Sequence, residues 1–174
     1  MRKPGAKSAS LPIASKARPR KPAKTRSADK AGTRIADKSK ARVASPGNPK
    51  SGLPHALGMR FTSVTRKKVR AEMRIKPMHL TRWGYVHGGA IMAFADAVGA
   101  AGTVANLMPG HRTVTIESKT NFFSAGKGPV LTAVSVPLHI GRRTMVWQTT
   151  ISNADERRVA LITQTQIVLA PADD

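Results

Sequence analysis

The residues with the clearest chemical potential lie in one stretch, GYVHGGAIMAFADAVGAAG, at positions 84–102. Gly88 and Gly89 lack side chains, so another molecule can approach their backbone closely. If a helix begins there, its first amides are unpaired donors at the positive end of the helix dipole, which suits a developing negative charge. Asp96 is the only charged residue in the apolar run 90–107. Burial disfavours the charged form of a carboxylate, so Asp96 is suited to accept a proton.

The apolar run 90–107 predicts a helix that is buried on every side, because no polar stripe marks a solvent face. A transmembrane span is the competing interpretation. The borderline length of the run, its small residues and the charge of Asp96 all argue against a span. Asp96 could instead serve the structure, by capping a neighbouring loop or by pairing with an arginine. A lone carboxylate in such surroundings is more typical of an active site.

Alternation of polar and apolar residues on both sides of this run predicts strands. Residues 58–75 predict two short strands or one bent hairpin, which stops at Pro77. After Pro109 and Gly110 the alternation predicts four antiparallel strands. Two of these carry apolar rows, with Val130, Thr132, Val134, Val136 and Leu138 in one and Met145, Trp147, Thr149 and Ile151 in the other. The predicted class is α+β. A helix that is buried on every side needs both a curved sheet and a second copy of the chain to shield it from solvent.

Charge is unevenly distributed along the 174 residues, which carry a net formal charge of +21. Residues 1–54 hold 15 Lys and Arg against Asp29 and Asp37, a net of +13, with frequent proline and few large apolar residues. Such a segment cannot bury enough surface to offset the entropy of ordering, so we expect a disordered tail over 1–54. The tail is either a solvated extension or a polycation that weakly contacts nucleic acid or an anionic surface. The folded domain is expected over 57–170.

The residue inventory excludes several kinds of site. Cysteine is absent, so disulfides, thiolate metal sites and a cysteine nucleophile are excluded. The histidines other than His87 are scattered without ligand spacing, so no metal is expected. Residues 1–30 contain no apolar core long enough for a secretory signal, and no transmembrane segment is expected. We therefore expect a cytoplasmic protein.

The chain resembles the hotdog-fold thioesterases, and among them the PaaI-like and 4-hydroxybenzoyl-CoA-type enzymes, over about residues 57–170. The most specific part is His-Gly-Gly followed by an acid nine residues after the histidine, from His87 to Asp96. The segments IESKTNFF at 116–123 and GRRTMVWQTTI at 141–151 also look like strands of that family. The resemblance implies a long central helix wrapped by a curved antiparallel sheet, assembled as a homodimer or homotetramer.

The resemblance also implies an activity, the hydrolysis of an acyl-CoA thioester to a free carboxylic acid and coenzyme A. No separate cofactor is implied, because coenzyme A is part of the substrate. The Gly88 amide would donate to the oxyanion, with Gly89 completing the opening turn. Asp96 would act as nucleophile or general base. His87 would orient the site, although an imidazole could also transfer a proton.

The spacing of Gly88 and Asp96 adds a constraint. Eight residues separate them, which is roughly 12 Å along a helix, whereas base, water and carbonyl must lie within about 3 Å of one another at each step. We therefore expect a composite site, with Gly88 from one protomer and Asp96 from its partner. The family implies the same arrangement.

Two threonines lie at positions where members of the family have functional residues, but their match to the family is less certain than that of His87 and Asp96. Many members have an asparagine six residues before the histidine, contacting the thioester or the water, and here that residue is Thr81. One hydroxyl cannot present the two donors of an amide. Thr115 matches a Ser or Thr that orients the water. The alternative for Thr115 is an outward-facing polar residue, because strict alternation puts it on the face opposite Ile116 and Ser118.

Further residues are expected to bind the substrate. Trp83 and Tyr85 either line the acyl pocket or pack as core aromatics. Arg142 and Arg143 are expected to meet the phosphates of coenzyme A at the dimer edge, together with Lys127 and Arg112.

Two other functions compete with hydrolysis. A hotdog hydratase or dehydratase is the second enzyme class, but it relies on a catalytic histidine with a differently placed acid. A non-catalytic acyl-CoA-binding or nucleic-acid-tethered module is favoured by the basic tail and by Thr81. The pairing of His-Gly-Gly with Asp96 favours hydrolysis over both.

Overall fold

The computed structural model of the protein describes residues 50–171. The predicted basic tail, 1–54, therefore lies mostly outside the described residues. Its last part does not match the prediction, because a short helix, α1, covers Gly52–Ala56.

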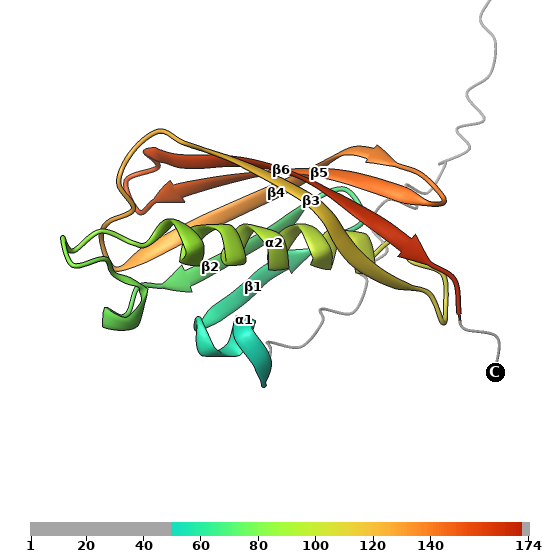
Figure 1. The fold of residues 1–174 in the computed structure, drawn as a ribbon, viewed down its shortest axis with the longest axis horizontal. Helices are drawn as coiled ribbons and strands as arrows, with labels where there is room; N and C mark the ends of the chain where they lie inside the picture. Colours follow the sequence, from blue (N-terminus) through green and yellow to red (C-terminus); the bar gives the residue numbers. More distant parts are fainter. Residues whose placement is uncertain (1–49, 172–174) are drawn as a thin grey trace, which may run out of the picture. The chain divides into compact units, whose positions relative to one another are not determined.

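Six antiparallel strands form one sheet within residues 50–171 (Figure 1). Their order across the sheet is β1-β2-β4-β5-β6-β3, so β1 and β3 are the two edges. The strands are β1 Met59–Val64, β2 Val69–Arg74, β3 Arg112–Phe122, β4 Val130–Ile140, β5 Thr144–Asn153 and β6 Arg158–Leu169. The predicted hairpin before the helix and the four predicted strands after it are confirmed.

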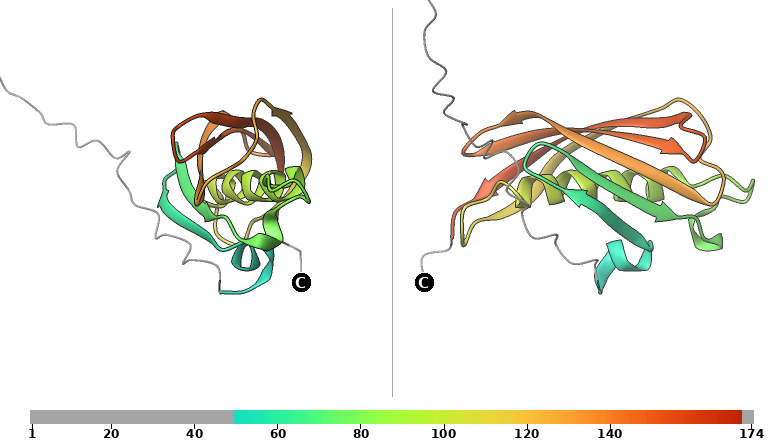
Figure 2. Two further views of the ribbon diagram at one scale, coloured as in Figure 1. Left: turned by 90° about the vertical axis from the view of Figure 1, so that its left-hand side faces the viewer. Right: turned by 180° about the vertical axis from the view of Figure 1, so that it is seen from behind.

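The long helix α2, Gly88–Val104, runs along the concave side of the sheet, and the sheet curls around it (Figure 2). The fold is thus the predicted hotdog arrangement of one helix and one wrapping sheet. Among residues 50–171, no helix combines the length and the apolar character needed to cross a membrane.

The ends of α2 differ slightly from the predicted run 90–107. The helix begins two residues earlier, because His87 caps it. It ends at Val104, and beyond it the Asn106 side-chain amide donates to the Gly102 carbonyl over 2.8 Å. Donation to one of the last carbonyls satisfies a group that the helix leaves unpaired.

Two glycines let α2 lie close to the sheet. A Cβ on Gly99 would lie 2.5 Å from the Gln164 carboxamide, and one on Gly102 would lie 2.6 Å from the Trp147 ring. Both distances are far below van der Waals contact, so side chains at these positions would force the helix away from β5 and β6. The small residues that weakened the transmembrane interpretation therefore serve helix-to-sheet packing.

The two apolar rows lie on opposite faces of the sheet. Met145, Trp147, Thr149 and Ile151 of β5 are all buried on the inner face. The row from Val130 to Leu138 in β4 faces outward instead. The residues of β4 that are buried against α2 are Leu131, Ala133 and Ser135.

One stripe of α2 remains open in the single chain, although the run was predicted to be buried on every side. Met92 is 40% exposed and Val104 is 51% exposed. Asp96 and Ala100 lie between them at helical spacing and are half-buried. The neighbouring edge strand β3 also exposes Val114 and Ile116. The sheet of one chain therefore covers α2 incompletely, and the uncovered stripe contains the candidate carboxylate.

Candidate active site

The first turn of α2 leaves one amide available. The Gly89 amide donates to His87 Nδ1 over 2.9 Å. The Ala90 and Ile91 amides both donate to the His87 carbonyl, over 3.0 and 3.2 Å. Within residues 50–171 the Gly88 amide has no hydrogen-bond acceptor. Gly88 is thus the donor that remains for another molecule at the positive end of the helix dipole.

The imidazole of His87 is engaged in holding this turn. Because Nδ1 accepts from Gly89, a neutral His87 carries its proton on Nε2. This hydrogen bond favours the orienting role expected for His87 over proton transfer through Nδ1. The backbone of the turn is held as well, since the His87 amide donates to the His79 carbonyl over 2.7 Å.

His79 supports this turn from a buried position that the sequence did not single out. The 3-10 helix η2, Pro77–His79, precedes the loop, and His79 is 1% exposed. Its Nδ1 accepts from the Lys76 amide over 3.1 Å, while its Nε2 is buried without a partner in the described part of the chain. Burial, followed by the charge of Lys76, lowers the pKa of His79 below its ordinary value of 6.5. The His79 side chain is therefore a neutral imidazole, buried beside the turn that begins α2.

Thr81 is tied into its own loop. Its hydroxyl accepts from the Trp83 amide over 3.3 Å, and its amide donates to the Tyr85 carbonyl over 2.7 Å. The Gly84 amide donates back to the Thr81 carbonyl over 3.0 Å. Thr81 thus closes the tight turn that leads to His87, which is a structural use of the position.

Asp96 is held by two donors on one oxygen. The Thr115 hydroxyl donates to Asp96 Oδ1 over 2.7 Å, and Gln164 Nε2 donates to the same oxygen over 3.2 Å. No partner of Oδ2, and no ion pair of Asp96, occurs among the described residues. Neither structural alternative for Asp96, loop capping or pairing with arginine, is therefore present in the described residues. The carboxylate is fixed through Oδ1 and open at Oδ2.

A β-bulge brings Thr115 to Asp96. The pairing of β3 with β6 shifts between Thr115 and Glu117, so Ile116 is an extra residue in β3. Such an insertion interrupts the period of two. Thr115 consequently faces the helix together with Ser118 and Thr120, while Ile116 is 58% exposed. The outward-facing alternative for Thr115 is wrong, because strict alternation does not hold across the bulge.

Two glutamines complete the site, and the sequence reasoning missed them. Gln164 and Gln166 are both fully buried on β6. Gln166 Nε2 donates to the Thr115 hydroxyl, and Gln166 Oε1 accepts from the Thr113 hydroxyl over 2.9 Å. The signal was available, because both glutamines share the period-two face of Ile162. Polar amides on a core-facing row need partners, and here the partners are the residues that hold Asp96.

One chain does not join Gly88 to Asp96. Gly88 is the first residue of α2 and Asp96 lies at its middle, so the two are roughly 12 Å apart at about 1.5 Å per residue. Asp96 lies on the uncovered stripe of the helix, with Met92 one turn before it. Within one chain the donor and the carboxylate are therefore too distant to act on the same carbonyl carbon.

The predicted binding residues fall into two groups. Trp83 is 67% exposed and Tyr85 is 42% exposed, so the core-aromatic alternative is wrong for both. Lys127 lies over the Tyr85 ring at 4.6 Å, close to the start of α2. Arg142 and Arg143 instead line a pocket with Asn106 and His111 beyond the other end of α2. The expected cluster of Lys127 with these arginines does not form within one chain.

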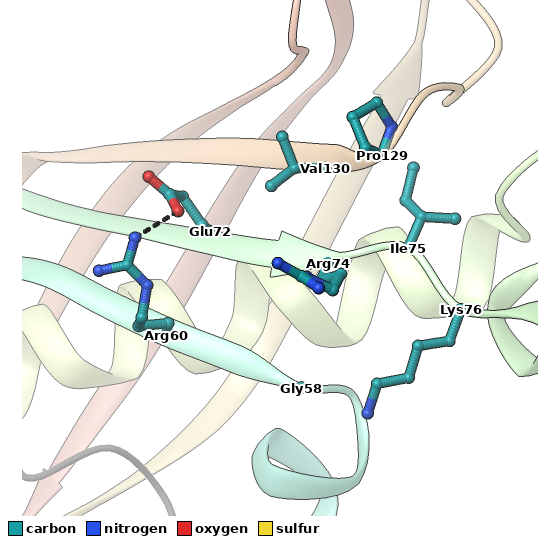
Figure 3. A pocket seen from close by; sticks show the side chains of 8 residues that line it. All are labelled: Gly58, Arg60, Glu72, Arg74, Ile75, Lys76, Pro129 and Val130. Atoms are coloured by element: carbon teal, nitrogen blue, oxygen red, sulfur yellow. Dashed lines mark hydrogen bonds and ion pairs between the residues drawn. The ribbon is translucent and has the colours of Figure 1, made fainter.

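A second pocket, of about 790 Å³, is shown in Figure 3. Arg60, Glu72, Arg74 and Lys76 contribute the charged groups of its lining. Its carboxylate, Glu72, is paired with Arg60 at 2.6 Å. Because its acid is paired, this pocket offers less for catalysis than the surroundings of Asp96.

Comparisons with known proteins show the family of the chain. The model of the thioesterase superfamily matches residues 84–160, from the loop before α2 into β6. Bacillus subtilis ComA2, named as an esterase, is 32% identical over 115 residues, which cover 64% of this chain and 90% of ComA2. The chain belongs to the thioesterase superfamily. It is accordingly an enzyme of the thioester hydrolase type.

Other similar proteins extend the comparison. The 1,4-dihydroxy-2-naphthoyl-CoA hydrolase of Listeria monocytogenes is 24% identical over 110 residues, 63% of this chain and 89% of the relative. Escherichia coli PaaI, from the phenylacetic acid degradation operon, has the same fold with a TM-score of 0.63 and 24% identity, covering 67% of this chain and 83% of PaaI. A hypothetical thioesterase from Streptococcus pneumoniae, solved with coenzyme A, has a TM-score of 0.60 and 26% identity, covering 66% and 88% of the two chains.

Proposed function

We propose that this thioesterase hydrolyses acyl-CoA thioesters to a free acid and coenzyme A, with Asp96 as the catalytic carboxylate. The observation that carries the proposal is the state of Asp96. Its Oδ1 is held by Thr115 and Gln164, and its Oδ2 has no partner among the described residues. A positioned carboxylate with one open oxygen on an uncovered surface is suited to act on a bound substrate.

The reaction needs only the groups described. The thioester carbonyl oxygen accepts from the Gly88 amide and gains negative charge as the carbonyl carbon is attacked. Either Asp96 Oδ2 takes a proton from the attacking water, or Oδ2 itself attacks and water then opens the anhydride. The carbon–sulfur bond breaks, and the thiolate takes the proton from Asp96 or from water. Single-turnover hydrolysis in labelled water distinguishes the two routes, since direct attack predicts label in Asp96.

The site is proposed to be shared between two copies of the chain. The uncovered stripe of α2 and the exposed apolar residues of β3 form one surface that a second copy would bury. A second α2 beside this stripe would bring its own Gly88 amide towards Asp96. This arrangement overcomes the separation of the two groups within one chain.

The length of the pantetheine arm and the positive charge of the pocket beyond α2 support coenzyme A as the thiol. Asn106 lies ten residues beyond Asp96, roughly 15 Å at about 1.5 Å per helical residue. The pantetheine arm between sulfur and pyrophosphate has the length of about four extended residues, or roughly 15 Å. Arg142 and Arg143 line the pocket beside Asn106 and can meet the phosphates. The coenzyme A of the Streptococcus pneumoniae structure and the hydrolase of Listeria monocytogenes support the same substrate class.

Substitution of Asp96 tests the proposal. Asp96→Asn keeps the shape and the acceptor for Thr115 but removes the charge, so thiol release from a panel of aromatic and straight-chain acyl-CoA thioesters should fall by about a hundredfold or more. Glu117→Gln, an exposed acid on β3, is the matched control and should retain full activity. Wild-type rates in Asp96→Asn would overturn the assignment, and the panel identifies the acyl group.

A further inference from the structure

A pocket on the outer face of the sheet is separate from the site around α2, and we call it the outer pocket (Figure 3). Side chains alternate between the two faces of a strand such as β2. Val69, Ala71 and Met73 belong to the buried core, so Glu72 and Arg74, which line the outer pocket, face the opposite way. The outer pocket lies towards β1, whereas the surface proposed for a second copy includes β3, the other edge of the sheet. A ligand in the outer pocket would therefore leave the candidate carboxylate and the shared surface free.

The apolar part of the outer pocket adjoins Arg74. Arg74 of β2 is paired in register with Val130 of β4, and residues directly opposite each other share a face of the sheet. The Ile75 amide donates to the Pro129 carbonyl over 2.9 Å, which holds the residue before β4 against the end of β2. Ile75, Pro129 and Val130 all line the outer pocket. A cation and an apolar surface are thus offered to the same ligand.

Two cations of the outer pocket have no acidic partner. Glu72 is the one acid of the lining, and Arg60 pairs with it at 2.6 Å, as the dashed line in Figure 3 marks. No ion pair of Arg74 or Lys76 occurs among residues 50–171. With three cations and one acid, the lining carries a net formal charge of +2. This charge is available to an anionic ligand.

Lys76 is held in place beside the outer pocket. A Cβ on Gly58 would lie 3.0 Å from both Cε and Nζ of Lys76, so the glycine leaves the room that the ammonium group occupies. Gly58 also has a positive φ of 64°, which favours glycine. The Lys76 amide donates to His79 Nδ1 over 3.1 Å, and the Lys76 carbonyl accepts from the His79 amide over 2.9 Å. A cation whose position is already fixed loses less conformational entropy when a ligand binds.

Charge and shape together define the ligand class. A dianion would neutralise the net charge of the lining, whereas a monoanion would leave one cation unmatched. Guanidinium and ammonium groups both bind carboxylate and phosphate oxygens. The volume of about 790 Å³ is that of a small-molecule site. We infer that the outer pocket binds a small organic dianion, a dicarboxylate or a phosphate monoester, whose charged groups contact Arg74 and Lys76.

Calorimetric titration of the full-length protein with three ligands that share one ring tests the ligand class. Near neutral pH, benzoate carries one negative charge, phthalate carries two on separate carboxylates, and phenyl phosphate carries nearly two on one group. At least one dianion should bind about fivefold or more tightly than benzoate, and the tighter one identifies its source. Inorganic phosphate, which lacks the ring, should bind more weakly than phenyl phosphate. If benzoate bound as tightly as both dianions, the inference would fail.

Neutral variants locate the bound ligand. The variant combining Arg74→Gln and Lys76→Gln should weaken binding of the tighter dianion by at least about tenfold. Arg142→Gln with Arg143→Gln is the matched control, because it removes the same charge from the pocket beyond α2, and its affinity should stay within about twofold of the wild-type value. Wild-type affinity in the first variant would reject the outer pocket. A loss confined to the control would place the dianion in the pocket proposed for coenzyme A.

A third variant predicts a gain that misfolding could not produce. Glu72→Gln removes the acid from the lining and frees the Arg60 guanidinium from its carboxylate partner. Binding of the tighter dianion should strengthen by at least about threefold. Unchanged or weaker binding in Glu72→Gln would contradict the role of the lining charge. Because no thioester enters these titrations, their outcome is independent of the proposed hydrolysis.

Discussion

The Thr115 hydroxyl donates to Asp96 Oδ1 across 2.7 Å, from an edge strand to the middle of the central helix. Gln166 Nε2 in turn donates to the Thr115 oxygen. The direction of both bonds matters, since the Thr115 proton is committed to the carboxylate and is not free to orient a water. Thr115 therefore positions Asp96, and the water-orienting role that the family resemblance implies stays a prediction.

Thr115 offers a conservative pair of variants. Thr115→Val keeps the shape but removes the donor, so kcat should fall by about tenfold, the value of one charge-assisted hydrogen bond of about 1.4 kcal/mol. KM should change little, because the hydroxyl contacts the carboxylate and not the substrate. Thr115→Ser retains the hydroxyl and should restore kcat, and failure to do so would contradict the positioning role.

The Gly88 amide can be removed with little disturbance of the helix. Gly88 is the first helical residue and His87 before it is extended, with ψ of 136°, so Gly88→Pro suits the local backbone. Gly88→Ala is the matched control, because alanine keeps the amide and both variants place a Cβ 3.1 Å from Phe122 Cζ. We expect kcat for acyl-CoA to be lower in Gly88→Pro than in Gly88→Ala by about a hundredfold. Similar rates in the two variants would show that the amide is not the oxyanion donor.

Complementation tests whether the site is shared. Asp96→Asn and Gly88→Pro should each be inactive alone. When the two chains are co-expressed with different tags, the purified mixed dimer contains one composite site with both native groups. Its activity should reach about half of the wild-type value. An inactive mixed dimer would place both groups of each site in the same chain.

His79 predicts a pH dependence of stability. Burial and Lys76 lower its pKa in the folded protein, so the unfolded chain binds its proton more readily. Stability is therefore fully present above the unfolded value of 6.5 and is lost as the pH falls below it. In His79→Asn, whose side-chain oxygen can replace Nδ1 as the acceptor for Lys76, the free energy of unfolding should decline less between pH 7 and about pH 5. Urea titrations across this pH range measure the free energy of unfolding, with exposed His139→Asn as the control. If the free energy of unfolding of His79→Asn declined with pH as steeply as that of the wild type, the prediction would be contradicted.

Much of the architecture was predictable from local patterns. The apolar run that contains Asp96 predicted a buried helix, and alternation predicted the hairpin before it and the four strands after it. Gln164 and Gln166 were predictable in principle as inward-facing residues, because they share the period-two face of Ile162 on β6. These features depend on the repeat of side chains along a helix or strand, which is a property of neighbouring residues.

The sequence by itself determined the composition of the site: a His-Gly-Gly turn, and one acid on a helix eight residues after the first of its glycines. Tertiary structure alone decided how the acid is held. A single inserted residue, Ile116, reverses the faces of β3 and turns Thr115 towards Asp96, and pairing with β6 brings in glutamines about seventy residues away in sequence. Strand pairing across the sheet sets these contacts, and the period of a single strand carries no information about which strand lies beside it or where the pairing shifts.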